Sequence, residues 1–140
     1  MSRFVVDASV AVKWYLPEIH ADAAARWLAR DAVFLAPDLI YAEFGNVLWK
    51  RVRSKELARS EARDIARAFR LVPVEVLPCE ALLTPALEIA CVLGRSLYDC
   101  LYLAVAVLRD CPLVTADRGL YDAIRGTGIA GSVRWVEDTL

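Results

Sequence analysis

Four acidic residues that stand in apolar stretches are the side chains best suited to chemistry in this sequence. Asp7 directly follows the apolar run of residues 4–6, and Asp117 follows the similar run of residues 113–116. Glu43 is the only charged residue in 39–49, and Asp99 is the only one in 96–108. Charged side chains are rarely placed in apolar stretches without a partner. We therefore interpret the four acids as candidates for one functional site.

The chemistry expected of such acids is metal binding. Carboxylates that converge repel each other and are driven to take up protons, and a bound divalent cation removes that repulsion. Oxygen ligands without histidine or cysteine favour Mg²⁺ or Mn²⁺ over zinc. Asn46 lies three residues after Glu43, on the same face of a helix, and is a supporting candidate.

Each acid also has a structural interpretation, which the sequence leaves open. Asp7 and Asp117 could each cap a following helix. Asp99 fits a capping box with Ser96, three residues earlier. Glu43 is expected early in its helix, where the helix dipole favours an acid.

The elements that must position these acids are strands that alternate with helices. Short apolar runs predict strands over residues 3–6, 33–35, 74–77, 113–115 and 133–136. Helical patterns predict a short turn over 9–14 and helices over 22–30, 39–53, 60–71, 84–94, 96–109 and 120–125. Their expected N-caps include Asp38, Ser60 and Thr84, the last followed by Pro85. Connections of this length require crossovers, so we expect a three-layer α/β/α sandwich around a mostly parallel sheet of four to five strands.

In such a sheet the four acids should meet at one edge. Asp7 and Asp117 end strands, and the carboxyl ends of parallel strands lie at the edge where ligands bind in open α/β folds. Glu43 and Asp99 are expected in the first turns of helices that begin near that edge.

Composition predicts a single domain over residues 1–140. The chain is 58% hydrophobic and has a net charge of −1. Its longest uninterrupted apolar run, residues 100–108, is far shorter than the roughly 20 residues of a membrane-spanning helix. Asp7 and Lys13 interrupt the apolar N-terminal stretch, which does not fit a signal peptide. We expect a cytoplasmic protein that does not bind membranes.

Positive charge is concentrated in residues 50–70, which hold eight basic and three acidic residues. Four arginines are spaced by four, four and three residues, which places them on one helix face. We call them the arginine stripe: Arg59, Arg63, Arg67 and Arg70. The stripe is a candidate RNA-binding surface, and a solvated face with ion pairs to Glu56 and Glu61 is the alternative. An apolar face in the same region, with Trp49, Val52, Leu57 and Phe69, is a candidate partner groove, with core packing as the alternative.

Several other kinds of site fit the sequence poorly. The four cysteines lack the close spacing of a zinc site, and the single histidine, His20, argues against Ser-His or Cys-His catalysis. A Gly-x-Gly-x-x-Gly pattern over residues 126–131 follows a helix instead of a strand, so we interpret it as a turn. An aspartyl phosphatase would have an acid where Ser9 stands. A receiver-like domain would have an acid after its third strand, where Pro78 and Cys79 precede Glu80. A non-enzymatic RNA-binding or scaffold protein would not need four acids in apolar surroundings.

Short motifs around the four acids resemble those of the PIN-domain ribonucleases, and within them the VapC-type toxins of prokaryotic toxin–antitoxin pairs. The matching segments occur in the family's order along nearly the whole chain. They are Val5-Val6-Asp7-Ala8-Ser9 with Val12-Lys13-Trp14, Tyr41-Ala42-Glu43, Tyr98-Asp99 and Leu113-Val114-Thr115-Ala116-Asp117.

This resemblance implies a Mg²⁺- or Mn²⁺-dependent endoribonuclease whose metal-binding quartet is matched by the four acids. Ser9 and Thr115 match hydroxyl positions that help to order the water around the metal. A homodimer is implied as well, blocked by a small antitoxin protein. Our hypothesis is that Asp7, Asp99 and Asp117 hold one ion, while Glu43 binds a second ion or orients the attacking water. Transfer RNA and ribosomal RNA are the expected substrates.

Overall fold

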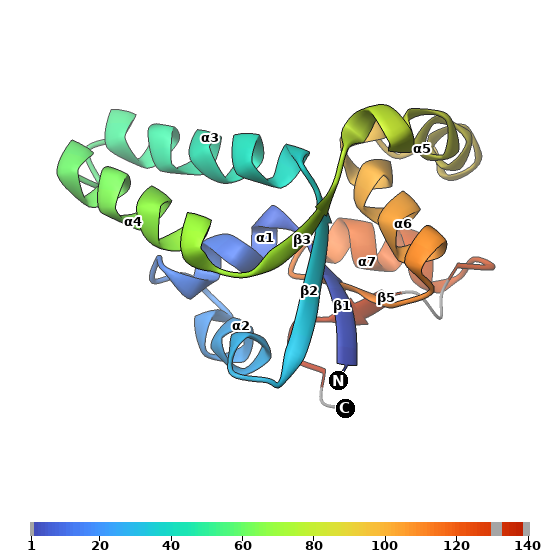
Figure 1. The fold of residues 1–140 in the computed structure, drawn as a ribbon, viewed down its shortest axis with the longest axis horizontal. Helices are drawn as coiled ribbons and strands as arrows, with labels where there is room; N and C mark the ends of the chain where they lie inside the picture. The colour runs from blue at the N-terminus through green and yellow to red at the C-terminus, as the bar shows by residue number, and fades with distance from the viewer. Residues whose placement is uncertain (1, 130–132, 139–140) are drawn as a thin grey trace.

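The computed structural model describes residues 2–129 and 133–138 and contains a central sheet of five parallel strands (Figure 1). Each strand lies within two residues, at either end, of the bounds expected from the sequence. The strands are β1 (Ser2–Val6), β2 (Ala32–Pro37), β3 (Val74–Leu77), β4 (Leu113–Thr115) and β5 (Val133–Trp135), in the spatial order β3-β2-β1-β4-β5. All four strand pairings are parallel, which confirms the expected sheet.

Helices fill the connections between the strands. They are α1 (Ala8–Ala11) with the 3₁₀ turn η1 (Val12–Trp14), α2 (Ala21–Leu28), α3 (Leu39–Arg53), α4 (Arg59–Leu71), α5 (Cys79–Leu93), α6 (Leu97–Arg109) and α7 (Arg118–Arg125). Helices α3 and α4 pack side by side and extend away from the sheet (Figure 1). We call this pair the α3–α4 arm.

Apolar side chains of the sheet and helices form two buried clusters. Phe4 of β1 packs edge-on against Trp27 of α2, with ring centroids 4.9 Å apart, in one cluster. Its neighbour Val5 belongs to the other cluster, which includes Leu103 of α6. Successive residues of a strand point to opposite faces. The result is the three-layer α/β/α arrangement expected from the sequence.

The strand order places a switch point between β1 and β4. The chain runs from β1 outward through β2 and β3, and then returns to the other side of β1 with β4. At such a point the connections leave in opposite directions, and a crevice opens at the carboxyl edge. Asp7 follows β1 and Asp117 follows β4, so both acids lie at this crevice. The order also differs from the 2-1-3-4-5 order of receiver-like domains, which argues against that alternative.

The N-caps expected at Ser60 and Thr84 are wrong. Helix α4 begins at Arg59 and not after Ser60, and Glu61 Oε1 accepts a hydrogen bond of 3.0 Å from Ala58 N. Helix α5 begins at Cys79, so Pro85 lies inside it and Thr84 is no N-cap. The reason is a distant partner: Asp38 Oδ1 accepts a hydrogen bond of 3.0 Å from Cys79 N. Asp38 therefore supports α5. The expectation that its side chain caps α3 is wrong.

Other expectations concern the ends of helices. Gly94 ends α5 with φ 70°, a left-handed conformation that glycine adopts without strain. Asp117 caps α7, which starts two residues earlier than expected. Gly126 ends α7, but residues 130–131 of the glycine pattern lie outside the described residues, so its interpretation as a turn is only partly visible.

Within residues 2–129 and 133–138, no single helix is long and apolar enough to cross a membrane. Helices α5 and α6 meet the length and composition criteria only as a pair, and the pair is bent by 113°. Much of α6 is buried against the sheet, which is the ordinary reason for an apolar helix in a packed domain.

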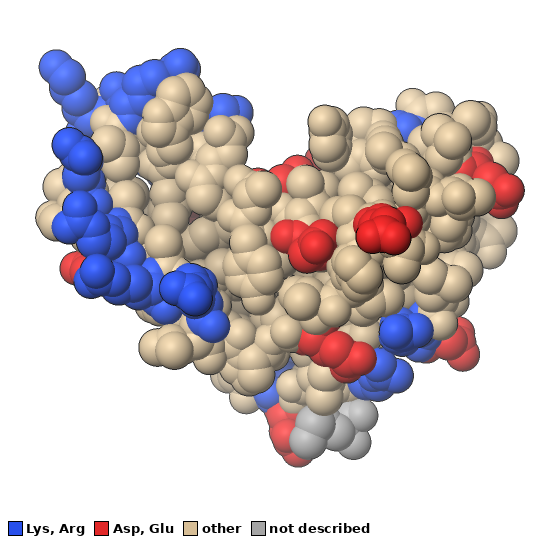
Figure 2. Space-filling model, turned by 45° about the horizontal axis from the view of Figure 1, so that its top comes forward, with Lys and Arg blue, Asp and Glu red and all other residues tan. Residues whose placement is uncertain are grey.

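The surface carries its charges in separate regions. Figure 2 shows Lys and Arg along the outer edge of the α3–α4 arm, whereas Asp and Glu gather nearer the middle of the same face. The surface is hollowed between the arm and the rest of the molecule in this view (Figure 2). A basic surface thus borders a more acidic one.

Candidate metal centre

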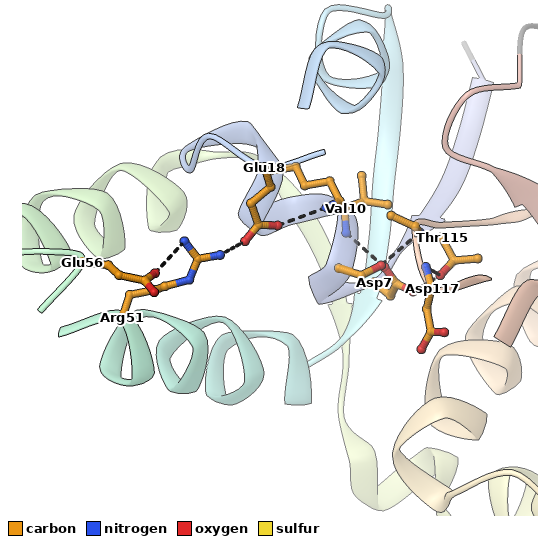
Figure 3. A network of polar contacts seen from close by, with 10 residues as sticks. Asp7, Val10, Glu18, Arg51, Glu56, Thr115 and Asp117 are labelled. Carbon is orange, nitrogen blue, oxygen red and sulfur yellow. Dashed lines mark hydrogen bonds and ion pairs between the residues drawn. The ribbon is translucent and has the colours of Figure 1, made fainter. Parts of the chain in front are cut away.

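Asp7 is the most deeply placed of the candidate acids. The residue is only 6% exposed and follows β1 as the N-cap of α1. Its Oδ1 accepts hydrogen bonds from Ser9 Oγ at 2.5 Å and Val10 N at 3.2 Å, and its Oδ2 accepts one from Thr115 Oγ1 at 2.5 Å. Figure 3 shows Asp7 close to Val10, Thr115 and Asp117. Both the helix-cap role and the position at the switch point are therefore present.

Burial controls the electrostatics of Asp7. Loss of hydration raises the pKa of this carboxyl from 3.8 to about 6, although the hydrogen bonds from Ser9, Thr115 and Val10 lower it. The nearby charge of Asp117 raises it further. A buried carboxylate with a raised pKa beside a second acid is a feature of functional sites.

The two hydroxyl residues predicted to support the centre do lie beside Asp7. Ser9 Oγ donates to Asp7 and accepts a hydrogen bond of 3.0 Å from Ala116 N. Thr115 Oγ1 donates to Asp7 and accepts a hydrogen bond of 3.0 Å from Asp117 N. These bonds join the end of β1 to the end of β4, and so hold the two strand-ending acids together.

The two carboxylate oxygens of Asp117 have different surroundings. Its Oδ1 caps α7 by accepting a hydrogen bond of 3.1 Å from Leu120 N. Its Oδ2 lies 3.9 Å from Arg95 Nη2, and the side chain is 46% exposed. One carboxylate oxygen therefore remains available on the solvent side of the crevice.

Asp99 lies in the first turn of α6 and is only half-buried, although most of that helix is apolar and buried. Ser96 Oγ accepts a hydrogen bond of 3.2 Å from Asp99 N, which is one half of the expected capping box. The Asp99 carboxylate instead pairs with Arg95, whose Nη2 is 3.0 Å from Oδ2. Arg95 thus lies between Asp99 and Asp117.

Glu43 is held by a residue that the sequence did not bring to notice. Tyr102 of α6 donates a hydrogen bond of 2.6 Å from its hydroxyl to Glu43 Oε1 on α3. Burial and the charges of Glu43 and Asp7 raise the pKa of Tyr102, which keeps its hydroxyl protonated and able to donate. Tyr102 is thus hydrogen-bonded to Glu43 and lies near enough to Asp7 for that charge to affect its pKa.

Local signals for the two missed residues exist but are weak. Tyr102 lies three residues after Asp99, on a neighbouring face of the same helix, and Arg95 lies four residues before it. Spacing alone does not say that an arginine turns toward a second acid or that a tyrosine reaches another helix.

The donor set fits a hard divalent cation, but it is not a preformed cage. Among the described residues, no three Asp, Glu, His or Cys side chains are close enough together to form a ready ligand group. Mg²⁺ commonly keeps several waters and takes only one or two carboxylates from the protein. Asp7 and Asp117 suit that mode, because their charges interact at the switch point and Asp117 presents one exposed oxygen. The residues present therefore fit such an ion in their chemistry.

The arginine stripe lies on α4, and all four of its side chains are exposed. In residues 2–129 and 133–138, none of them forms an ion pair with a carboxylate within 4 Å. The two acids considered as partners are engaged elsewhere: Glu56 pairs with Arg51 at 3.3 Å, and Glu61 accepts from the start of its own helix. The stripe thus carries positive charge without the ion pairs considered as an alternative.

The remaining candidates divide between surface and core. Asn46 is exposed on α3, one turn after Glu43. Phe69 is buried and stacks on Phe44 at 4.1 Å, so core packing is the correct interpretation for this member of the expected apolar groove. Trp49 is exposed beneath the guanidinium of Arg53. A cavity of about 460 Å³ opens between α3 and α4, lined by Tyr41, Phe44, Gly45, Ala66, Phe69 and Arg70.

A second polar network lies near Asp7 but does not include any of the four candidate acids (Figure 3). Glu18 accepts from Lys13 at 3.0 Å and also pairs with Arg51, which reaches Glu56. This chain of contacts ties the segment after η1 to the α3–α4 arm. We interpret it as structural.

Comparison with known proteins agrees with this architecture. A family model described as the PIN domain matches residues 4–125. Ribonuclease VapC3 of Pyrobaculum aerophilum is 30% identical over 122 residues, covering 84% of this chain and 92% of that protein. Ribonuclease VapC9 of Mycobacterium tuberculosis is 32% identical over 118 residues, covering 84% and 88%. The crystal structure of PAE2754 from Pyrobaculum aerophilum has a TM-score of 0.67 and 26% identity, and covers 97% of this chain and 85% of that one.

The fold and the site together define an α/β/α protein with carboxylates at the switch point of a parallel sheet. The chain belongs to the PIN domain family, since that model spans most of its length. Within the family it is similar to proteins named VapC ribonucleases, which confirms the resemblance found in the sequence.

Proposed function

We propose that this protein is a metal-dependent endoribonuclease and the toxin of a toxin–antitoxin pair. The observation that carries the proposal is Asp7, a carboxylate 6% exposed at the switch point, with a raised pKa and a second acid beside it. The names of its relatives, which describe them as ribonucleases, support the choice of RNA as substrate. A phosphodiester is also the kind of substrate that an acidic metal centre handles well.

The residues have separate roles in this proposal. Bound Mg²⁺ or Mn²⁺ would supply Lewis acidity and make water a stronger nucleophile near neutral pH. Asp7, Asp99 and Asp117 would hold the ion directly or through water. Ser9 and Thr115 hold the Asp7 carboxylate in place by hydrogen bonds. Glu43, fixed by Tyr102, would orient the attacking water or hold a second ion, and cleavage would leave 5′-phosphate and 3′-hydroxyl ends.

The arginine stripe would hold the RNA backbone beside this centre. Four guanidinium groups along one helix, with no ion pair to any carboxylate in the described part of the chain, suit a row of phosphates, and such binding weakens as salt concentration rises. Transfer RNA and ribosomal RNA are the substrate classes we propose. A small antitoxin protein, a homodimeric assembly and action in the cytoplasm complete the proposal, supported by the likeness to VapC proteins.

The test is an RNA cleavage assay on purified protein with transfer RNA and ribosomal RNA. We expect cleavage with Mg²⁺ or Mn²⁺ and none after chelation. Asp7→Asn should abolish cleavage and leave the fold intact. The matched control is Asp122→Asn, since Asp122 is an exposed acid on α7 that pairs only with Arg125 at 3.8 Å among the described contacts. Wild-type cleavage by Asp7→Asn would contradict the assignment.

A PIN-fold RNA-binding protein or scaffold without nuclease activity is the competing function. Titration calorimetry with Mn²⁺ separates the two. RNA binding without metal binding or cleavage would favour the scaffold and reject the enzyme.

A further inference from the structure

Arg95 is the only cation that the described structure brings between two of the candidate ligands. One guanidinium nitrogen, Nη2, lies 3.0 Å from Asp99 Oδ2 and 3.9 Å from Asp117 Oδ2. The two carboxylates come from different elements, the first turn of α6 and the start of α7. The same nitrogen therefore lies close to where a cation shared by the two acids would be placed.

The surroundings of Arg95 indicate that the acids hold it there. Its side chain is 29% exposed, and its Nε is buried with no hydrogen-bond partner in the described residues. A buried donor without a partner costs free energy. The attraction of Asp99 and Asp117 for the guanidinium offsets that cost and stabilises the side chain in this position.

Gly119 of α7 is a neighbour of both Arg95 and Asp117. A Cβ atom added at Gly119 would meet Asp117 Oδ1 at 3.4 Å and Arg95 Nη1 at 3.7 Å. These are ordinary van der Waals distances, so the start of α7 lies directly beside both the Asp117 carboxylate and the Arg95 guanidinium.

We propose that Arg95 is a built-in competitor of the metal ion, a deduction that rests on the proposed function. In the metal-free protein it neutralises Asp99 and Asp117 and so stabilises the fold. A divalent cation that takes these carboxylates must displace it, because two cations within about 4 Å of the same oxygens repel each other. Arg95 would therefore lower metal affinity and stabilise the metal-free state at the same time.

The test compares Mn²⁺ binding by calorimetry in wild type, Arg95→Gln and a control. We expect Arg95→Gln to bind Mn²⁺ roughly tenfold more tightly, a modest gain because the pair is partly exposed. The control is Arg125→Gln, which removes the same charge from the C-terminal end of α7 but leaves the candidate ligands untouched. Arg95→Lys, which keeps the charge, should stay close to the wild-type affinity.

A second measurement separates competition from an ordinary structural role. Without metal, Arg95→Gln should lower the Tm by about 3 °C, since Asp99 and Asp117 lose their counter-charge. With saturating Mn²⁺ the difference should vanish, because the ion then does the neutralising. A residue that only supports the fold would lower the Tm equally in both conditions.

The outcomes are distinguishable. Unchanged or weaker Mn²⁺ binding by Arg95→Gln, or an equal Tm loss with and without Mn²⁺, overturns the role of Arg95. If wild type binds Mn²⁺ and cleaves RNA in that case, the proposed function survives. If wild type neither binds Mn²⁺ nor cleaves RNA, both proposals fail.

Discussion

The Tyr102 hydroxyl donates a hydrogen bond of 2.6 Å to Glu43 Oε1 and thereby joins α6 to α3 at the edge of the candidate metal centre. Tyr102 is buried in the core, whereas Glu43 is half-buried. The rigid helix thus sets the direction of a carboxylate on the neighbouring helix. Positioning of this kind, by groups around the ligands, commonly affects metal sites as much as the ligands do.

We expect Tyr102→Phe to lower the free energy of unfolding by about 1 kcal/mol, because a partly exposed hydrogen bond to a carboxylate is lost. RNA cleavage should fall while RNA binding stays unchanged, since Glu43 loses its orientation. Urea unfolding and a cleavage assay measure the two effects. Tyr98→Phe is the control, as Tyr98 is 61% exposed on the same helix. Cleavage at the wild-type rate would show that Glu43 needs no such support.

Asp7 predicts a pH-dependent stability. Its pKa is raised in the folded state from 3.8 to about 6, so the folded protein binds a proton more tightly than the unfolded chain. Stability from this group is present below about pH 4 and is lost as pH rises to about 6. Asp7→Asn removes the loss, so its advantage over wild type should grow across this range. At neutral pH we expect a gain of roughly 3 kcal/mol at most, from the size of the shift.

Urea unfolding of both proteins across that pH range measures this difference. The difference between the two proteins is the useful quantity, because the contributions of ionisable groups remote from Asp7 cancel in it. Asp122→Asn should show no such trend. A difference that shrinks as pH rises would mean that the charge of Asp7 is stabilised in the fold, contrary to its burial.

The arginine stripe predicts salt-dependent RNA binding. Charge reversal of Arg63 and Arg67 to Glu should weaken binding by at least about tenfold and flatten its dependence on salt, since fewer phosphates are neutralised. Fluorescence anisotropy with labelled RNA at several salt concentrations is the measurement. The control reverses Arg26 and Arg109, which are exposed on α2 and α6, away from the arm. Equal weakening by both variants would point to net charge and not to the stripe.

Asp38 predicts a stability effect at the start of α5. Asp38→Ala removes the acceptor for Cys79 N at the start of α5 and should cost about 1 kcal/mol, a usual value for a lost cap. The hydrogen bonds from Cys79 lower the pKa of Asp38 below its usual value of 3.8. The stability that Asp38 contributes should therefore be lost as the pH falls below that value and the carboxylate is protonated. Asp31→Ala, an exposed acid before β2, is the control in thermal unfolding. No change in Asp38→Ala would mean that α5 starts without help from Asp38.

The strands and most helices were predictable because their signals are local. The apolar runs at 74–77 and 113–115 match β3 and β4 residue for residue, and the need for crossovers is enough to predict parallel pairing. The start of α5 was missed because Asp38 supplies its N-terminal acceptor from 41 residues away. Local cap patterns such as Thr84-Pro85 cannot compete with a partner that only the fold brings near.

The same distinction applies to the site. Asp7 and Asp117 were predictable from their positions after strands, and Ser9 and Thr115 from the family motif. The partial exposure of Asp99 could not be predicted, because it depends on how α6 packs at the edge of the sheet. The contacts of Arg95 with Asp117 and of Tyr102 with Glu43 join residues 22 and 59 positions apart, and no pattern in the sequence encodes them.

The hydrogen bond between Thr115 and Asp7 spans 108 positions of the chain. During synthesis the N-terminal part of the centre leaves the ribosome long before the strand that completes it. A growing chain therefore lacks the assembled acidic crevice until β4 can pair with β1. We expect nascent chains that end before β4 to lack the candidate metal centre, so that any activity of this centre begins only once β4 has left the ribosome.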